Sequence, residues 1–425
     1  MKLLLKNGRV VDPGAGIDER LDVLVEDGKV SALTRNILAD GAETVDVEGL
    51  VVCPGFIDMH VHLREPGQEW KETIASGTRS AASGGFTAVA CMPNTVPVND
   101  SRSVTEFILA QAAAGGVVGV HPIGCVTKGQ EGKELAEMED MLDAGACAFS
   151  DDGKPVLSGL IMRRALEYSR TFDVPIIDHC EDPAIVGGGV MNEGAVSTRL
   201  GLRGWPAAGE DVMVQRDLIL AEDTGGHVHI AHMSTARSAE FVRQAKRREV
   251  PATCEVTPHH LLLSDAAVGE YDTDAKMNPP LRTEGDLEGL LRALADGTVD
   301  AIATDHAPHH VDEKQVEFSQ APFGIVGLET AVALCLDRLV HRGIIDLARM
   351  VELFTVGPAR ILRLDRGRLA QGSDADISVL DLDKRTTVDS GRFASLSRNT
   401  PFGGWELRGA PVITVVGGKI VHDAR

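Results

Sequence analysis

Five residues with metal-binding side chains each follow an apolar run of the sequence. His60 and His62 end the run GFIDMHVHL, and His179, His232 and Asp305 end VPIIDHC, HVHIAHMS and VDAIATDH. Residues two apart on a strand point to the same side, so His60 and His62 can direct both imidazoles into one cavity. Four imidazoles with one carboxylate form a ligand set suited to Zn²⁺. A lone His-x-His pair also occurs at ordinary loop edges, whereas five such residues in order at strand ends indicate a metal site.

Strand-like and helix-like runs alternate between about residues 53 and 360. The eight strand-like runs are GFIDMHV, FTAVACMP, VVGVHPI, ACAFS, VPIIDH, HVHIAH, PATCEVT and VDAIAT. Helical patterns, including residues 103–114, 134–144, 159–172 and 286–297, separate several of them. This alternation predicts an α/β fold of the (β/α)8 TIM-barrel type, whose active sites lie at the carboxyl ends of the strands. An open doubly wound sheet is the alternative, but the sequence has no Gly-rich dinucleotide fingerprint.

Both ends of the chain are rich in short strand-like runs with glycine turns. They include LLLKNGRVVD and LDVLVEDGKVSAL near the start, and PVITVVGGKIVHD near the end. The dipeptides Asn7-Gly8 and Asp27-Gly28 are hairpin signals. These patterns predict a small β-sandwich domain assembled from residues 1–52 and 361–425, beside a catalytic barrel of residues 53–360.

Composition restricts the class of protein. The 425 residues are 43% apolar, enough for a large core, yet no run approaches the roughly 20 apolar residues that cross a bilayer. The start, MKLLLKNGRVVDPG, is predicted as strand and turn rather than signal peptide. A net charge of −21 argues against a nucleic acid partner, because phosphate contacts need clustered Lys and Arg. Seven scattered cysteines indicate reduced thiols and a cytoplasmic location.

Seven motifs carry a resemblance to a known family. PGFIDMHVHLREPG, CMPNT, AFSDDG, DHCED, AHMST, MNPPLR and ATDHAPH, in this order, resemble class I bacterial dihydroorotases, which are cyclic amidohydrolases of the amidohydrolase superfamily. The resemblance covers essentially the whole chain. It implies a zinc enzyme, with two Zn²⁺ expected per subunit and one as the alternative. Such an enzyme interconverts N-carbamoyl-L-aspartate and L-dihydroorotate in de novo pyrimidine biosynthesis, opening the ring amide with a metal-bound hydroxide.

The resemblance also assigns the metal ligands. Asp305 becomes a ligand of the first metal and the general acid/base, and the histidine ligands divide into His60 with His62 and His179 with His232. Many relatives bridge two metals with a carboxylated lysine on strand four, but here ACAFSDDGKP has no lysine at the strand end. Class I dihydroorotases are similar in placing an aspartate there. Family spacing favours Asp152 over Asp151, while strand alternation leaves both open because both lie beyond the strand.

A substrate pocket is implied as well. Arg64 stands two residues beyond His62, at the expected cavity rim, and its forked donors match a carboxylate. Dihydroorotate carries a ring carboxylate, which hydantoin and allantoin lack. The other implied contacts are Asn94 and His309 to the carboxylate, and Asn278 with backbone groups near Phe323 and Gly324 to the ring amide edges. The alternative for Arg64 is a surface ion pair, for example with Glu65.

Several neighbouring residues are expected to have no ligand role. His227 and His229 stand at odd offsets from His232 and are predicted to face the opposite side, as packing or surface residues. Asp58 is expected either to orient a ligand or to bind backbone groups. The polar segment 309–324 is predicted as a loop over the site.

Two rival functions stay open. A hydantoinase- or allantoinase-like cyclic amidase would carry a bridging lysine and no carboxylate clamp. A non-catalytic or partner-dependent dihydroorotase-like subunit of an aspartate transcarbamoylase complex is the second rival. A non-catalytic chain is expected to lose metal ligands, whereas this sequence retains all five of the candidate ligands His60, His62, His179, His232 and Asp305. The expected assembly is a homodimer, with aspartate transcarbamoylase as a further partner.

Overall fold

The central element of the fold is a barrel of eight parallel strands. The computed structural model describes residues 2–425, and the strands follow the order β15-β14-β13-β10-β9-β8-β7-β6. Their bounds are β6 (Phe56–Val61), β7 (Phe86–Cys91), β8 (Gly119–Gly124), β9 (Ala148–Ser150), β10 (Ile176–Asp178), β13 (Val228–Ile230), β14 (Ala252–Val256) and β15 (Ala301–Ile302). A parallel bridge between Val61 and His306 joins the two ends of the sheet. The predicted barrel is confirmed, with all eight predicted strands in order.

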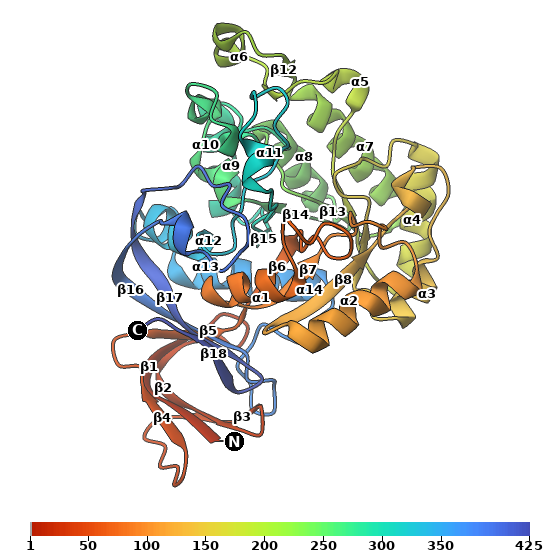
Figure 1. Cartoon of the computed structure of the whole chain (residues 1–425). Coiled ribbons are helices and arrows are strands. Elements are labelled where there is room, and N and C mark those ends of the chain that lie inside the picture. Colours follow the sequence, from red (N-terminus) through yellow and green to blue (C-terminus); the bar gives the residue numbers. More distant parts are fainter. Residues whose placement is uncertain (1) are drawn as a thin grey trace.

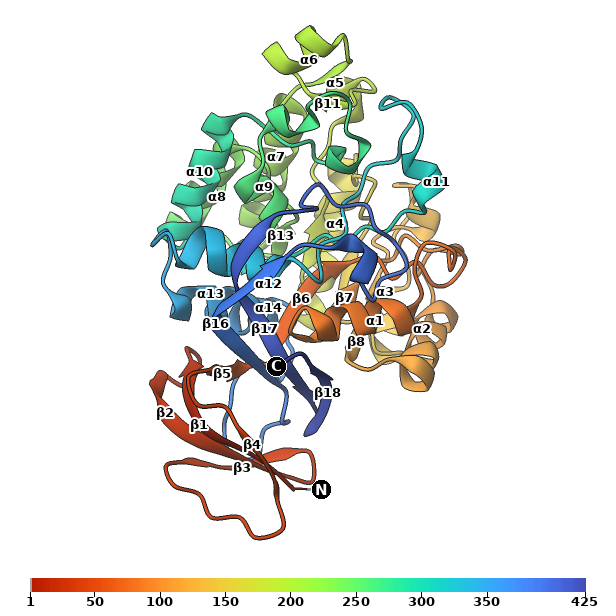
Figure 2. The same cartoon turned by 60° about the vertical axis from the view of Figure 1, so that its left-hand side comes forward.

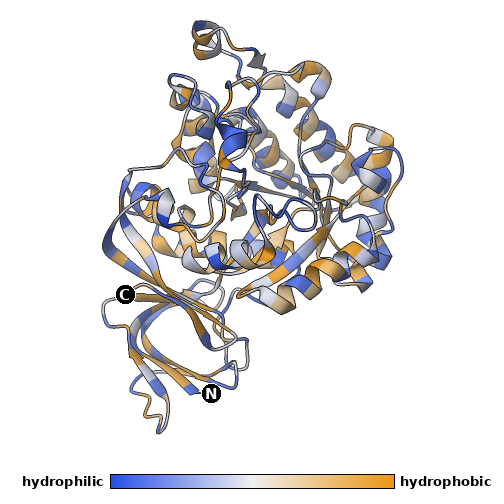
Figure 3. Ribbon diagram, in the orientation of Figure 1, coloured by the Kyte–Doolittle hydropathy of each residue, from blue (hydrophilic) through white to orange (hydrophobic). Residues whose placement is uncertain are grey.

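Helices surround the barrel (Figure 1). The main ones are α1 (Ile74–Ser83), α2 (Arg102–Gly115), α3 (Met138–Asp143), α4 (Gly159–Phe172), α7 (Ala208–Thr224), α8 (Ala236–Arg247), α10 (Glu284–Ala295), α12 (Ala331–Cys335), α13 (Leu347–Phe354) and α14 (Val356–Ile361). They carry both hydrophobic and hydrophilic residues, as expected for helices that bury one face (Figure 3). Helix α3 begins at Met138 rather than residue 134, because Leu135 forms an isolated antiparallel bridge with Thr127.

Strand alternation separates two apolar layers. On β14, Cys254 and Val256 join the outer core beneath the helices, which leaves Thr253 and Glu255 directed into the barrel. A second cluster fills the interior and includes Met59, Ala90, Ile123, Ile177, Ala231, Ala303 and Ile361. None of the helices within residues 2–425 has the length and hydropathy needed to cross a membrane.

The second sheet combines strands from both termini, which lie in the same part of the molecule (Figure 2). Its order is β18-β17-β16-β5-β1-β2-β3, with β4 beside β1. The bounds are β1 (Lys2–Asp12), β2 (Ile17–Glu26), β3 (Lys29–Thr34), β4 (Glu43–Asp46), β5 (Val51–Pro54), β16 (Ile377–Thr387), β17 (Glu406–Val416) and β18 (Lys419–Asp423). The hairpin tips at Gly28 and Gly418 are in contact, so the sheet folds over its own apolar core as the predicted sandwich.

One of the two hairpin predictions is wrong. Asp27-Gly28 joins β2 to β3 as expected, but Asn7-Gly8 lies inside β1, where the register with β2 shifts between Leu5 and Gly8. Asn7 takes the left-handed conformation with φ 68°, and its N–H donates to Asp22 Oδ1 at 2.8 Å. The neighbouring strand therefore holds this dipeptide as a β-bulge, and the chain continues without reversing.

The connection between β16 and β17 reaches the carboxyl end of the barrel. Asn399 in this connection donates from Nδ2 to the carbonyls of Ala307 and Gly324, both at 3.0 Å. Its Oδ1 accepts the N–H of His309 at 3.1 Å. The C-terminal part of the chain thus holds two loops that border the site described next.

Candidate active site and metal centre

The predicted ligands converge at the carboxyl end of the barrel. They lie in or just after five different strand ends, and none exposes more than 5% of its surface. They are His60 and His62 from β6, Asp152 after β9, His179 after β10, His232 after β13, and Asp305 after β15. The strand ends of a barrel surround one central point, which is why residues so distant in sequence meet here.

Asp152 lies at the centre of the histidines. Its Oδ1 is 3.4 Å from His60 Nε2 and 3.5 Å from both His179 Nδ1 and His232 Nε2. Its Oδ2 is 3.5 Å from His62 Nε2. One carboxylate therefore faces both histidine pairs, which is the geometry that a bridging ligand requires.

Asp305 faces the first histidine pair. Its Oδ1 lies 3.0 Å from His62 Nε2 and 3.5 Å from His60 Nε2. Three overlapping groups of ligand atoms, each within 4.8 Å, can be drawn from these residues: His60, His62 and Asp152; Asp152, His179 and His232; and His60, His232 and Asp305. Within the described chain, buried His60 Nε2 and Asp152 Oδ1 form no hydrogen bond. A metal ion would satisfy these unpartnered lone pairs, so the residues fit a zinc centre.

Asp151 turns away from this cluster. Its Oδ1 accepts the N–H groups of Val126 and Thr127, at 2.9 and 3.0 Å, and its Oδ2 accepts the Thr127 hydroxyl. Burial raises the pKa of Asp151 to about 6. Burial also opposes ionisation of Asp152, but the nearby imidazoles of His60 and His179 hold the pKa of Asp152 well below its usual range. Asp152 is therefore ionised, the form that binds metal.

Two carboxylates that the sequence analysis did not single out contact the ligands. Glu255 on β14 accepts the Nδ1–H of His60 at 2.6 Å. Glu181 Oε2 lies 3.1 Å from His179 Nε2 and accepts the Nδ2–H of Asn278 at 3.2 Å. A metal-binding histidine usually donates its second N–H to a carboxylate or carbonyl. The sequence did offer one signal for Glu255, because it is the only acidic residue in the strand-like run PATCEVT.

The prediction that His229 faces away from the site is wrong. Its ring is fully buried inside the barrel, and its Nε2 lies 3.3 Å from Glu255 Oε2. His232 stands beyond the end of β13 with φ 30°, so strand alternation does not relate the two rings. Of the two roles expected for Asp58, the structure shows binding to backbone groups, since its Oδ1 accepts the backbone N–H groups of His60 and Thr304.

Arg64 lies inside the cavity, with 9% of its surface exposed. Its Nε donates to the Pro308 carbonyl at 3.2 Å, and the guanidinium forms no ion pair within residues 2–425. The alternative pairing with Glu65 is not observed, because Glu65 accepts the N–H of Ile74 at the start of α1. Burial lowers the pKa of Arg64 only to about 10, so the side chain stays cationic.

The cavity itself has a volume of about 320 Å³. With the exception of His60, which lies beneath it, every predicted site residue lines it: His62, Arg64, Asn94, Asp152, His179, His232, Asn278, Asp305, His309, Phe323 and Gly324. Asn94 Oδ1 is 2.9 Å from His62 Nδ1, which leaves its amide N–H₂ for another partner. Asn278 Oδ1 is buried without a hydrogen bond in the described chain.

Some of the expected backbone contacts are already occupied. His309 Nε2 lies 2.8 Å from the Phe323 carbonyl, and the Gly324 N–H donates to the Lys276 carbonyl at 2.9 Å. Carbonyl oxygens have a second lone pair, so those of Phe323 and Gly324 remain able to accept from a ligand. The Gly324 N–H is not available to one.

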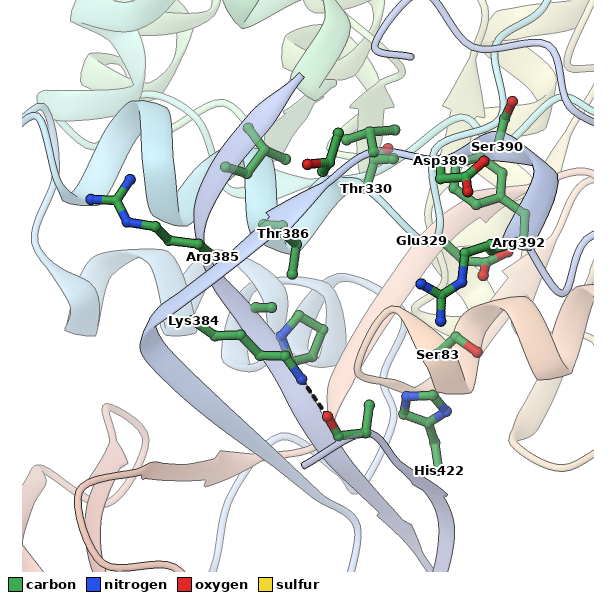
Figure 4. Close-up of a pocket in the computed structure, with 18 of the residues that line it drawn as sticks. Ser83, Glu329, Thr330, Lys384, Arg385, Thr386, Asp389, Ser390, Arg392 and His422 are labelled. Carbon is green, nitrogen blue, oxygen red and sulfur yellow. Dashed lines mark hydrogen bonds between the residues drawn. The ribbon is translucent and has the colours of Figure 1, made fainter. Parts of the chain in front are cut away.

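A larger cavity lies elsewhere, beside β16, β17 and α12 (Figure 4). Its volume is about 1170 Å³, and Lys384, Arg392 and His422 are among its lining residues. The Lys384 ammonium donates to the Ala424 carbonyl. None of the candidate metal-ligand groups found in residues 2–425 borders it. The metal-ligating chemistry therefore belongs to the smaller cavity.

The two ends of the segment 309–324, His309 and residues 322–324, line the smaller cavity, and the segment contains the short helix α11 (Val311–Lys314). Two buried lysines hold it. Lys276 donates from Nζ to the Phe318 carbonyl at 2.7 Å, and Lys314 donates to the Pro322 carbonyl at 3.0 Å. Neither ammonium has a carboxylate partner in the described chain.

These lysines should make stability depend on alkaline pH. Burial lowers the pKa of Lys276 and of Lys314 from 10.5 to about 8. Between these values the unfolded chain binds more protons than the folded one, so the lysines' contribution to stability rises with pH. We expect the unfolding free energy of the unaltered chain, relative to Lys276→Met, to increase from pH 8 to pH 10 in urea titrations. A constant difference would contradict this.

Comparisons with known proteins agree with the geometry. A family profile described as dihydro-orotase-like matches residues 49–238. A dihydroorotase of Geobacter metallireducens is 55% identical over 99% of this chain and 100% of its own, and one of Geobacter sulfurreducens is 56% identical over 100% of both. Among solved structures, an L-hydantoinase (dihydropyrimidinase) from Arthrobacter aurescens superposes with a TM-score of 0.90 at 28% identity, covering 99% of this chain and 96% of that one. The chain belongs to the dihydroorotase family of cyclic amidohydrolases.

Proposed function

We propose that this chain is a zinc-dependent dihydroorotase. It would catalyse the reversible cyclisation of N-carbamoyl-L-aspartate to L-dihydroorotate in de novo pyrimidine biosynthesis. The observation that carries the proposal is Arg64, a buried cation without an ion-pair partner in the described chain, in the cavity that the metal ligands line. A buried charge is costly unless paired, and a ring carboxylate supplies the missing partner.

The candidate metal ligands would divide between two Zn²⁺ ions. His60, His62 and Asp305 would hold one, His179 and His232 the other, and Asp152 would bridge them. Zn²⁺ supplies Lewis acidity, which lowers the pKa of water toward ~7 and polarises a carbonyl oxygen. Asn94 fixes the orientation of the His62 ring, since its Oδ1 lies 2.9 Å from the ring Nδ1.

Asp305 is the proposed general acid/base. In the hydrolytic direction its carboxylate takes the proton of the attacking water and delivers it to the ring nitrogen that leaves. Arg64 and the Asn94 amide N–H₂ bind the substrate carboxylate, and the unpartnered Asn278 Oδ1 accepts a ring N–H. His309 Nδ1 forms no hydrogen bond in the described chain, because the neutral ring donates from Nε2 to the Phe323 carbonyl. Burial and the charge of Arg64 hold the pKa of His309 well below its usual range, so the ring donates from Nδ1 only when the substrate carboxylate offsets that charge. Cyclisation reverses these steps.

The nearest competing activity is that of a hydantoinase, because hydantoinases share the fold. Two features oppose it in this chain: an aspartate stands where those relatives bridge with lysine, and Arg64 offers a carboxylate site that hydantoin cannot fill. A ring-opening assay on zinc-supplemented protein, with L-dihydroorotate and hydantoin offered separately, tests the proposal. We expect turnover of dihydroorotate alone. Turnover of hydantoin alone would overturn the proposal. If neither substrate is turned over, the result would favour the partner-dependent or non-catalytic subunit.

Replacing Arg64 with Ala should impair substrate binding rather than metal binding. A charge-assisted bond to a carboxylate contributes about 2–3 kcal/mol, which corresponds to a roughly 30- to 150-fold rise in KM for dihydroorotate. Zinc content should not change, because no ligand is removed. Steady-state kinetics with metal analysis measures both. The clamp role fails if Arg64→Ala loses its zinc or keeps the KM of the unaltered enzyme.

The proposal extends to the organisation of the protein. We propose a β-sandwich of residues 1–52 and 361–425 beside a barrel of residues 53–360, a homodimeric assembly, a cytoplasmic location, and aspartate transcarbamoylase as a partner. Analytical ultracentrifugation of the purified chain, alone and mixed with aspartate transcarbamoylase, measures the assembly and the partnership.

A further inference from the structure

A row of polar side chains begins at the proposed metal ligand His60 and continues into the interior of the barrel. On β14, Thr253 and Glu255 point inward, because Cys254 between them packs in the outer core. His227, just before β13, and His229 on it likewise alternate with the outward Val228 and Ile230. The surrounding interior is apolar, so this row needs an explanation.

The members of the row are in contact from end to end. Glu255 Oε1 accepts the Nδ1–H of His60 at 2.6 Å, and its Oε2 lies 3.3 Å from His229 Nε2. His229 Nδ1 is 2.8 Å from the Thr253 hydroxyl, which is also 2.8 Å from His227 Nε2. Glu255 and His229 are completely buried.

With neutral imidazoles in the row, one arrangement of protons satisfies every contact. Glu255 faces the His60 Nδ1 and the backbone N–H of His232 with one oxygen and His229 Nε2 with the other, so its carboxylate is the acceptor in each contact. His60 Nδ1 must then carry a proton. His229 Nε2 and Glu255 Oε2 form no hydrogen bond within the described chain, but they lie 3.3 Å apart, and a proton on Nε2 makes this contact attractive. The Nδ1 of His229 is left with a lone pair, to which the Thr253 hydroxyl donates. That hydroxyl in turn accepts the Nε2–H of His227.

We propose that Glu255 and His229 are positioning residues that hold His60 in its Nδ1–H form and aim its Nε2 at the metal site. The inference rests on the metal centre proposed above. A carboxylate behind a histidine ligand fixes the ring orientation and makes the ring a stronger base, and both effects favour metal binding. Glu255 Oε1 also accepts the backbone N–H of His232 at 3.2 Å, so one side chain supports a ligand of each proposed ion.

Zinc affinity tests the positioning role. Glu255→Leu keeps the side-chain volume but removes the acceptor, and we expect zinc to bind about 10- to 100-fold more weakly in chelator competition. Glu255→Gln keeps an acceptor oxygen and should recover most of that loss. His121→Gln is the matched control: it removes an imidazole from β8 that is outside the row, and zinc affinity should not change. Undiminished affinity in Glu255→Leu would overturn the proposal.

The tautomer of His229 provides a second measurement, which would not change if Glu255 had only a structural role. In Glu255→Gln, the N–H groups of His60 and His232 keep the amide oxygen on their side, so the amide N–H₂ faces His229 Nε2. His229 must then accept at Nε2 and carry its proton on Nδ1. We expect ¹⁵N spectra of the ring nitrogens to show Nε2–H in the unaltered chain and Nδ1–H in the variant. An unchanged His229 tautomer would overturn the proposal.

The two readouts separate this inference from the proposed function. If the unaltered chain takes up no zinc, the proposed metal centre is wrong. The change of His229 tautomer needs no metal, so it still tests the proton arrangement proposed for the row. If zinc binds but neither variant at Glu255 weakens it, the metal centre stands and the positioning role is wrong.

Discussion

Replacing Asp305 with Asn is expected to lower kcat about 10²- to 10⁴-fold in both directions, the range that a general acid/base contributes. An amide has nearly the size of a carboxylate and retains an oxygen 3.0 Å from His62, so the substitution disturbs the ligand set little. It cannot, however, accept and return the proton that the reaction moves. Initial rates of ring opening and of ring closure, with zinc content determined on the same samples, measure the effect.

The control for this substitution lies in the loop over the cavity. Asp312→Asn removes an exposed carboxylate from α11 and should leave kcat and zinc content unchanged. A variant at Asp305 that holds its zinc and keeps kcat within about threefold of the unaltered enzyme would exclude a general acid/base role, because even the weakest such catalyst contributes about 10²-fold.

Replacing Asp152 with Ala is expected to release metal. Its two oxygens lie 3.4 to 3.5 Å from nitrogens of four histidines, so its loss removes the one carboxylate that faces both sites. Since outer contacts of a metal site already account for about 10- to 100-fold in affinity or activity, a ligand itself should account for at least 100-fold. Zinc per chain and ring-opening rates measure the loss.

Asp151→Ala is the matched comparison, with a different expected defect. Asp151 accepts three hydrogen bonds from Val126 and Thr127, so its removal should cost about 1–3 kcal/mol of unfolding free energy for each N–H left unsatisfied. Zinc content should stay near that of the unaltered chain. Equal zinc loss in the two variants, or greater loss at Asp151, would show that the bridging position is assigned to the wrong aspartate.

The barrel, the terminal sandwich and the candidate ligands could all be predicted from the amino-acid sequence. The eight strands are marked by local apolar runs, and their carboxyl ends must meet because the strands are parallel and the barrel is closed. His60, His62, His179, His232 and Asp305 could therefore be placed around one point without knowing any loop conformation. Arg64 followed from its spacing to His62 and from the family motif.

Other features depended on contacts between distant segments. Alternation does not extend past a strand end, so only the loop at Val126 and Thr127 shows that Asp151 turns away and that Asp152 faces the histidines. The same limit misplaced His229, because His232 lies beyond its strand.

The remaining decisions came from tertiary partners that no local pattern encodes. Asn7-Gly8 has the composition of a turn, but hydrogen bonding to Asp22 keeps it inside a strand. Asn399 reaches the site from a connection in the other domain, and Glu255 meets His60 from a strand 195 residues away. Residue types and periodicity specify which groups can do chemistry. Only the packed barrel decides which carboxylate faces which imidazole, because that choice depends on side-chain distances of a few ångströms between segments far apart in the chain.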